Sequence, residues 1–166
     1  MARATSNIAA LRRILQQEVI SGNSLIALAE EASASIINGE TDKLAPLEQR
    51  QRQVLDQQRI QESARISATR DLAWGLKLDR VPPLSELIGV LPPTDASDLA
   101  KLRGQLLELH THLERVNSRN RLLLDNMLAY VHFSLDVLTS AALQPARYGT
   151  NLTQVSAPTF YVDSKA

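Results

Sequence analysis

The sequence predicts an all-α protein, namely an elongated antiparallel bundle of three long helices with a short connecting helix and a flexible C-terminal tail. Three observations support this prediction. Apolar residues recur every three or four positions over three long segments. Leu, Ala, Gln and Arg abound while aromatic residues make up only 4% of the 166 residues, a balance that favours helices over sheets. Prolines and one Asn-Gly pair separate the periodic segments.

The first predicted helix covers residues 8–36. Its contact positions follow alternating steps of three and four, as in a coiled coil: Ile8, Leu11, Leu15, Glu18, Gly22, Leu25, Ala29, Ala32 and Ile36. Thr5 or Ser6 is expected to cap its start, and Asn38-Gly39 is expected to end it. Glu18 and Gly22 interrupt the apolar seam, so we expect a bend or a looser contact there.

The second predicted helix begins at Thr41 or Asp42 and runs antiparallel to the first, because the link between them is short. Its stretch from Glu48 to Glu62 is rich in Gln, Arg, Glu and Asp and is expected to be only lightly buried. Contact with the bundle is expected to resume through a later apolar set: Ile66, Leu72, Trp74 and Leu76. Val81-Pro82-Pro83 is expected to end the helix.

Two proline pairs enclose residues 84–91, which predict a short connecting helix that plugs one end of the bundle. The third long helix is predicted for residues 95–142, with Thr94 as its cap and two aspartates at its positive end. Its seam is the longest in the chain: Leu99, Leu102, Leu106, Leu109, Leu113, Val116, Asn120, Leu123, Met127, Tyr130, Ser134 and Val137. Further apolar residues widen this stripe beyond what one seam requires. Asn120 either fixes the helix register or is a simple boundary position.

The length predicts one domain with a short tail, and we assign residues 1–143 to the bundle and 144–166 to a mobile tail. The tail contains Pro145 and Pro158 and lacks a helical period. The N-terminal segment carries Arg12 and Arg13, so a secretory signal is not expected. The least polar stretch is too short to span a membrane. We therefore expect a soluble, cytoplasmic protein without membrane insertion.

No catalytic, cofactor or metal site is expected. The chain has no cysteine, and His110 and His112 point about 200° apart on one helix, so they do not share a metal. Eighteen basic and eighteen acidic residues leave no net charge to attract nucleic acid. The Arg- and Gln-rich residues 49–65 could suggest RNA contact, but no aromatic residues interleave with them for stacking, which favours a solvated helix face.

Three short segments resemble a known family. Residues 116–124, Val-Asn-Ser-Arg-Asn-Arg-Leu-Leu-Leu, resemble the Leu-Asn-x-x-Asn-x-x-Leu-Leu pattern of FlgN-like flagellar type III export chaperones. Residues 147–151, Arg-Tyr-Gly-Thr-Asn, resemble that family's Tyr-Gly-x-x-Gly element, with Asn151 in place of the second glycine. The turn Asn-Gly-Glu-Thr-Asp-Lys-Leu at residues 38–44 resembles the family's Gly-Asp/Glu-x-x-x-Leu link. The likeness in layout covers nearly the whole chain.

The resemblance implies a cytoplasmic, non-enzymatic chaperone that binds the C-terminal helical segment of hook-associated (hook–filament junction) proteins. It also implies delivery of these proteins to the cytoplasmic domain of the flagellar export gate, through Tyr148 and Gly149 of the tail. The family motif and the surplus apolar width give the expected client-binding residues: Leu113, Asn117, Asn120, Leu124, Met127, Leu128, Val131, Leu135 and Leu138. The alternative is a structural coiled-coil scaffold or self-associating helical adaptor, and a homo-oligomer in the absence of client is compatible with the same stripe.

Overall fold

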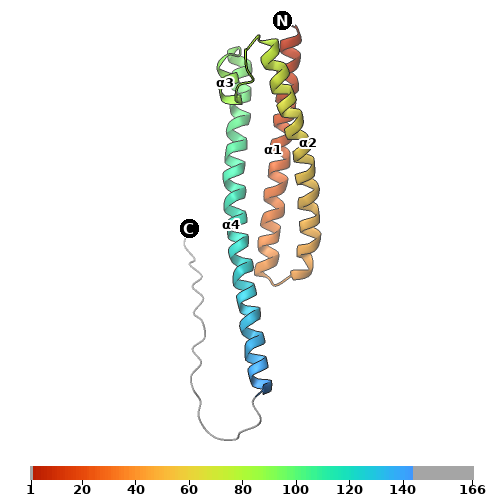
Figure 1. The fold of residues 1–166 in the computed structure, drawn as a ribbon, viewed down its shortest axis with the longest axis vertical. Helices are drawn as coiled ribbons and strands as arrows, with labels where there is room; N and C mark the ends of the chain where they lie inside the picture. Colours follow the sequence, from red (N-terminus) through yellow and green to blue (C-terminus); the bar gives the residue numbers. More distant parts are fainter. Residues whose placement is uncertain (1, 144–166) are drawn as a thin grey trace. The chain divides into compact units, whose positions relative to one another are not determined.

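A computed structural model describes residues 2–143, and this part of the chain is entirely helical with no β-strand (Figure 1). Its elements are α1 (Ala2–Ile37), the 3-10 turn η1 (Thr41–Lys43), α2 (Leu44–Gly75), α3 (Leu84–Gly89) and α4 (Pro93–Leu143). The all-α prediction is confirmed. The described residues fall into two units, which divide between Leu128 and Ala129. The predicted tail, residues 144–166, lies outside the described residues.

The turn between α1 and α2 is closed by glycine, as the sequence predicts. Gly39 has a positive φ of 71°, a conformation that costs glycine little, and the Glu40 N–H donates to the Ser35 carbonyl at 2.8 Å. Pro46 lies in the first turn of α2, where its missing N–H leaves no helical bond unmade. Helix α1 begins at Ala2, so Thr5 and Ser6 lie inside the helix and the predicted cap is wrong; Ala2 and Arg3 favour this earlier start.

Two other helix boundaries also differ from the sequence prediction. Helix α2 ends at Gly75, before the prolines, because Lys77 adopts a left-handed φ of 58° and the Leu78 N–H donates to the Ala73 carbonyl at 3.0 Å. This ending was missed because a lysine takes the place where glycine is usual. Helix α4 begins at Pro93, whose fixed φ suits a first helical position, so Thr94 lies inside the helix.

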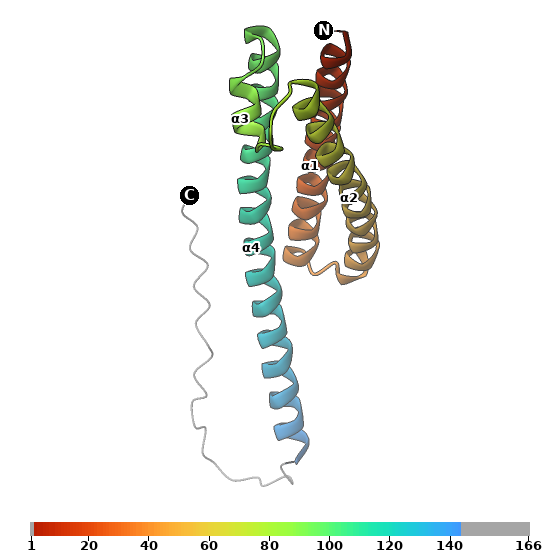
Figure 2. The same cartoon turned by 45° about the horizontal axis from the view of Figure 1, so that its top comes forward.

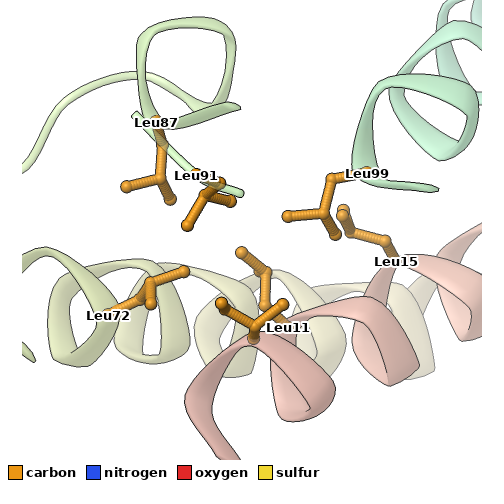
Figure 3. Close-up of a cluster of buried hydrophobic side chains, with 7 residues drawn as sticks. Leu11, Leu15, Leu72, Leu87, Leu91 and Leu99 are labelled. Atoms are coloured by element: carbon orange, nitrogen blue, oxygen red, sulfur yellow. The ribbon is translucent and has the colours of Figure 1, made fainter. Parts of the chain in front are cut away.

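A leucine core joins all four helices at the end of the first unit where α3 lies (Figure 3). Leu11 of α1 lies toward Leu72 of α2, Leu15 lies toward Leu99 of α4, and Leu87 and Leu91 lie on the side opposite α1. The buried members of this core are Ile8, Leu11, Leu15, Leu72, Leu87, Leu91 and Leu99. The predicted plug is confirmed, because Leu87 is fully buried and Leu84 and Ile88 pack partly against the core.

The contact face of α2 corrects the prediction at two positions. Ile66 and Trp74 were expected in the seam, yet they are 55% and 63% exposed. Thr69, Leu72 and Ala73 are the residues of this segment that are buried. Trp74 follows Ala73 by about 100° around the helix and so falls on the outer face. There the Arg70 guanidinium lies 5.3 Å from the centre of its ring.

Backbone contacts between helices are concentrated in the α1–α2 hairpin, whereas α4 is joined to α1 chiefly through side chains. At one end, the Arg12 guanidinium bridges Asp95 at 2.7 Å and Asp98 at 3.3 Å. In the middle, Leu109 lies so close to Gly22 that a Cβ there would be 3.2 Å from the Leu109 Cδ1. Gly22, a break in the predicted seam, is therefore a position where α4 approaches the α1 backbone.

The seam of α4 is buried at Leu99 and Val116 and half-buried at most positions between them. In the second unit, Tyr130 and Val137 are 60% and 48% exposed, so their predicted seam contacts are not made within the described residues. Residues 129–140 instead present large apolar side chains on several faces of the helix: Tyr130, Val131, Phe133, Leu135, Val137 and Leu138.

Candidate functional site

A groove runs between α2 and α4 of the first unit, with α1 as its floor. Near the α1–α2 turn, α1 lies between α2 and α4 in both views (Figures 1 and 2). All four helices close around the leucine core, but the described chain supplies no fourth helix toward the turn. Two hollows result, each lined by α1, α2 and α4: a core-side hollow of about 620 Å³ and a turn-side hollow of about 760 Å³.

The turn-side hollow is apolar at its floor and along much of both walls. Ile36 of α1 and Leu47 of α2 are buried beneath it, while Leu124 and Leu128 of α4 remain 39% and 57% exposed. The rim carries Arg121 and Asp125 on the α4 side and Glu48 on the α2 side. Exposed leucines above an apolar floor with charges at the rim are typical of a surface that receives an amphipathic helix.

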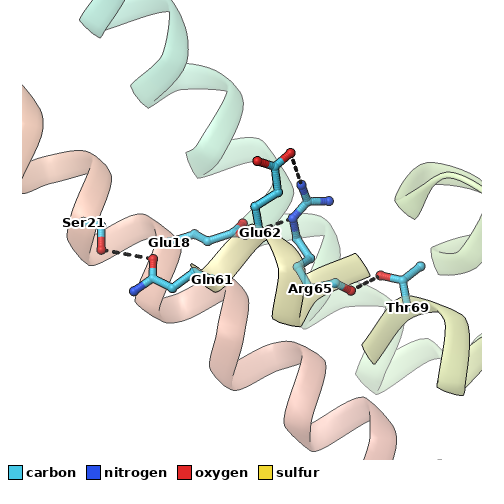
Figure 4. A network of polar contacts seen from close by, with 6 residues as sticks. All are labelled: Glu18, Ser21, Gln61, Glu62, Arg65 and Thr69. Carbon is cyan, nitrogen blue, oxygen red and sulfur yellow. Dashed lines mark hydrogen bonds and ion pairs between the residues drawn. The ribbon is translucent and has the colours of Figure 1, made fainter. Parts of the chain in front are cut away.

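The core-side hollow combines apolar walls with charged groups. Its apolar lining comes from four leucines: Leu55 of α2 and Leu106, Leu109 and Leu113 of α4. Glu18, Glu62 and Arg65 enter the same hollow from α1 and α2 (Figure 4). The Arg65 Nε donates to the Glu18 Oε1 at 2.9 Å. Glu18, which interrupts the predicted apolar seam of α1, thus lies among the charged residues of the core-side hollow.

Burial changes the ionisation of Glu18. Its side chain is only 14% exposed, and desolvation raises the pKa of the carboxyl above its ordinary value. The positive charge and the hydrogen bond of Arg65 lower the pKa and offset part of this rise, while the nearby Glu62 adds a smaller increase. A carboxylate held in this way is more costly to keep charged than one in water.

The two hollows adjoin, because the residues that line them are one turn apart on both walls. On α2 the step is from Gln51 to Leu55, and on α4 it is from Asn117 to Leu113. The groove therefore follows α4 from Leu106 to Leu128, a length of about 33 Å at 1.5 Å per residue. A partner helix of about six turns fits this length.

Asn120 lies at the edge of the turn-side hollow but is bonded to α1. Its Nδ2 donates to the Ala29 carbonyl at 2.7 Å, and its Oδ1 accepts from the Ser33 hydroxyl. Arg119 donates to the same hydroxyl at 2.9 Å. Of the two interpretations that the sequence left open, this network supports the register-fixing one, since the amide groups join α4 to α1.

The sequence-predicted site residues lie in different parts of the structure. Leu113 lines the core-side hollow, and Asn117, Asn120, Leu124 and Leu128 line the turn-side hollow. Met127 is half-buried and lines neither hollow. Val131, Leu135 and Leu138 are exposed in the second unit. Tyr148 and Gly149 lie outside the described residues.

The α1 and α2 sides of the groove were not predicted from the sequence. No residue of α1 or α2 was assigned to a client-binding surface, and Arg65 was interpreted as part of a solvated helix face. Two features of the sequence pointed to these sides. Glu18 interrupts the apolar seam of α1, and a polar stretch of α2 lies opposite it. Locating them together requires the hairpin geometry, which the seam pattern alone does not give.

Among the described residues, no group of three or more His, Cys, Asp and Glu is arranged to hold a metal ion. His110 and His112 are surface residues. The His110 Nε2 lies 3.4 Å from the Glu114 Oε1, and the His112 Nε2 lies 3.4 Å from the Glu30 Oε1. Within the same part of the chain, no helix combines the length and apolar character needed to cross a membrane.

The sequence model of the FlgN protein family matches residues 1–155, which include every helix that forms the groove. No curated protein and no solved structure is significantly similar to the chain. The fold, the groove and a match over far more than half of the sequence agree with the resemblance found in the motifs at residues 116–124 and 147–151. The chain therefore belongs to the FlgN family, and this membership implies a role as a flagellar export chaperone that binds flagellar proteins.

Proposed function

We propose that this chain binds the C-terminal helical segment of hook-associated (hook–filament junction) proteins in the cytoplasm and delivers them to the flagellar export gate. The observation that carries the proposal is the groove between α2 and α4. Its exposed leucines Leu55, Leu124 and Leu128 face a space that no helix of the described chain fills. An amphipathic client helix would bury them and complete a four-helix arrangement.

The charges at the turn-side rim support a helical client with a polar outer face. Arg121 and Asp125 stand four residues apart on α4, and neither makes an ion pair with another described residue. Client side chains of opposite charge at the edge of the helix would pair with them and orient the encounter. Such rim pairs favour one direction of binding, while the buried leucines supply most of the affinity.

The second unit offers a further candidate contact for the client. Its helical residues 129–140 expose the six large apolar side chains named above, among them the predicted client residues Val131, Leu135 and Leu138. Apolar side chains gathered in this way mark interaction sites on soluble proteins. We include these residues in the proposed client surface, as predicted from the sequence.

The groove is tested by charge substitution at its leucines. Leu124→Glu and Leu128→Glu should each weaken binding of the purified C-terminal segment of a hook-associated protein, because a buried carboxylate would replace an apolar contact. A loss of about 1–3 kcal/mol, or five- to 150-fold in Kd, is expected by isothermal titration calorimetry. Leu122→Glu is the matched control, since Leu122 is exposed on the same helix and lines neither hollow.

Unchanged affinity in both groove variants, with helicity intact by circular dichroism, would show that the client binds elsewhere. Val131→Glu and Leu138→Glu, measured in the same titration, separate the second unit from the groove. Light scattering of the free chain tests the alternative function. A stable dimer that is broken by Leu124→Glu and does not bind the client segment would favour the self-associating scaffold.

A further inference from the structure

The core-side hollow carries a charged layer among its leucines. Glu18, Glu62 and Arg65 form this layer (Figure 4), and Arg59 and leucines of α2 and α4 also line the hollow. A partner helix that fills the groove would cover this layer and remove water from it. The polar groups that have no bond within the chain would then need partners on the bound helix.

The bonding within the layer leaves both a donor and an acceptor available. Arg65 uses its Nε to bond Glu18 at 2.9 Å, but its Nη2 lies 4.0 Å from the Glu62 Oε1, which is too long for a hydrogen bond. Among the described residues the Nη groups of Arg65 therefore make no hydrogen bond, and only one oxygen of Glu18 accepts one. The layer offers N–H donors and a carboxylate oxygen side by side.

Charge decides which side chain completes this layer. Glu18 and Arg65 are the least exposed charges of this layer, with 14% and 33% of the side chain exposed, and they balance each other. Glu62 and Arg59 are 62% and 81% exposed, and Arg59 pairs with Asp56 of its own helix. An added Lys, Arg, Asp or Glu would leave net charge in a desolvated site. A leucine would leave the Arg65 donors and the Glu18 oxygen unpaired. A side-chain amide accepts from Arg65, donates to Glu18 and adds no charge.

We infer that the bound helix carries one glutamine or asparagine at the groove-facing position that crosses Glu18 and Arg65, and that this pairing fixes its register. The inference rests on the proposed function, because it specifies what that groove recognises. A one-turn slip of the helix along its apolar stripe would place a leucine over the layer and leave the donors and the acceptor unsatisfied. The leucines thus provide affinity and the charged layer selects a single alignment.

The test is a double-mutant cycle between this layer and the client. Each Gln and Asn of the C-terminal segment of a hook-associated protein from the same bacterium is changed to Leu. The resulting peptides are titrated against the wild-type chain and against Arg65→Met. At one position, the change to Leu should weaken binding to the wild-type chain about tenfold or more, because buried polar groups lose their partners. The same change should have little effect on binding to Arg65→Met, or should strengthen it.

Arg59→Met is the matched control, because Arg59 lines the same hollow but pairs with Asp56 of its own helix and its side chain is 81% exposed. Binding to Arg59→Met should weaken on loss of the client amide as much as binding to the wild-type chain does. Glu18→Gln provides a second variant should Arg65→Met unfold. The carbonyl oxygen of the introduced Gln side chain can still accept from Arg65. Its NH₂ group, however, would face the NH₂ group of the client amide, so two donors would meet. The coupling energy between this position and the client amide should therefore also fall.

Equal effects of every client substitution on the wild-type chain and on Arg65→Met would overturn the inference and leave the proposed groove intact. Tight binding of a segment that contains no glutamine or asparagine would overturn it in the same way. Failure of every hook-associated segment to bind the wild-type chain would instead overturn the proposed function, and this inference with it.

Discussion

Glu18 shows how a single residue can serve recognition at a cost to stability. It occupies a core position of the α1 seam, where leucine would pack more favourably, and its charge is balanced by Arg65 from the neighbouring helix. The raised pKa of the carboxyl records that burial outweighs this pairing. Residues that lower the stability of the fold in this way are typical of sites that bind a partner.

The first prediction concerns the pH dependence of stability at this position. Because the folded-state pKa of Glu18 lies above its ordinary value of 4.5, the folded chain binds this proton more tightly than the unfolded chain. The contribution of protonated Glu18 is fully present below pH 4.5 and is lost as the pH rises through the raised pKa. Glu18→Gln should therefore exceed the wild type in free energy of unfolding at pH 7, with a difference that disappears toward pH 4.

Urea unfolding at several pH values measures this difference. A Glu18→Gln chain that is less stable than the wild type at pH 7 would show that the ion pair with Arg65 outweighs desolvation.

The second prediction concerns the amide of Asn120. Asn120→Ala removes the bond to the Ala29 carbonyl and the bond to the Ser33 hydroxyl, so it should lower the free energy of unfolding by about 1–3 kcal/mol. Asn117→Ala is the matched control, because Asn117 is exposed one turn away and makes no hydrogen bond to another described residue. Urea unfolding of both variants gives the comparison, and equal losses would remove the register role of Asn120.

At the scale of elements, the arginines of α2 are engaged with carboxylates along the helix. Arg52 pairs with Glu48 at 2.6 Å, Arg59 with Asp56 at 3.2 Å, and Arg50 reaches Glu31 of α1 at 3.4 Å. These pairs are exposed, so each contributes little to stability. They also reduce the positive field that a nucleic acid would require.

The third prediction follows from these exposed pairs. Replacing Arg50, Arg52 and Arg59 together by Gln should change the free energy of unfolding by less than about 1 kcal/mol. Thermal or urea unfolding checks the stability. RNA binding, measured by fluorescence anisotropy at several salt concentrations, should be negligible in both chains. A steep, salt-dependent affinity in the wild type that is lost in the variant would contradict the solvated-face interpretation.

The sequence predicted those elements that depend on local pattern. The three-four seams predicted all three long helices, the Gly39 turn predicted the hairpin, and the leucines between the proline pairs predicted the plug by α3. Trp74 was misplaced because hydrophobicity alone does not give the rotation of α2, which buries Thr69, Leu72 and Ala73 and leaves Trp74 exposed. The groove was predicted on one wall only, since its other sides come from segments that the hairpin brings opposite α4.

At the scale of the whole molecule, the fourth prediction separates client binding from delivery. Truncation after Leu143 should leave thermal stability and client affinity nearly unchanged, because the groove is formed within residues 18–128. By the family resemblance, the truncation should reduce binding to the cytoplasmic domain of the export gate, and Tyr148→Ala alone should reproduce most of this loss. Calorimetry with client and a pull-down with the gate domain measure the two activities separately.

Phe160→Ala is the control, as it removes an aromatic residue of the tail outside the Tyr-Gly motif. Loss of client affinity on truncation would assign the tail to the client site. An undiminished interaction with the gate would remove the docking role of Tyr148.

The uneven contact among the helices has a consequence for the order of folding. The α1–α2 hairpin closes through a short link, while Asn120 and Ala29, which join α4 to α1, are 91 positions apart in the chain. Closing the larger loop costs more entropy before any contact is gained, so the hairpin should form first and α4 should dock last. The groove then exists only after this final step, and a chain still being synthesised has no site with which to capture a client. Backbone amides at the α1–α2 contact should exchange their hydrogens more slowly than those of α4. Bound client should slow the exchange of the α4 amides most.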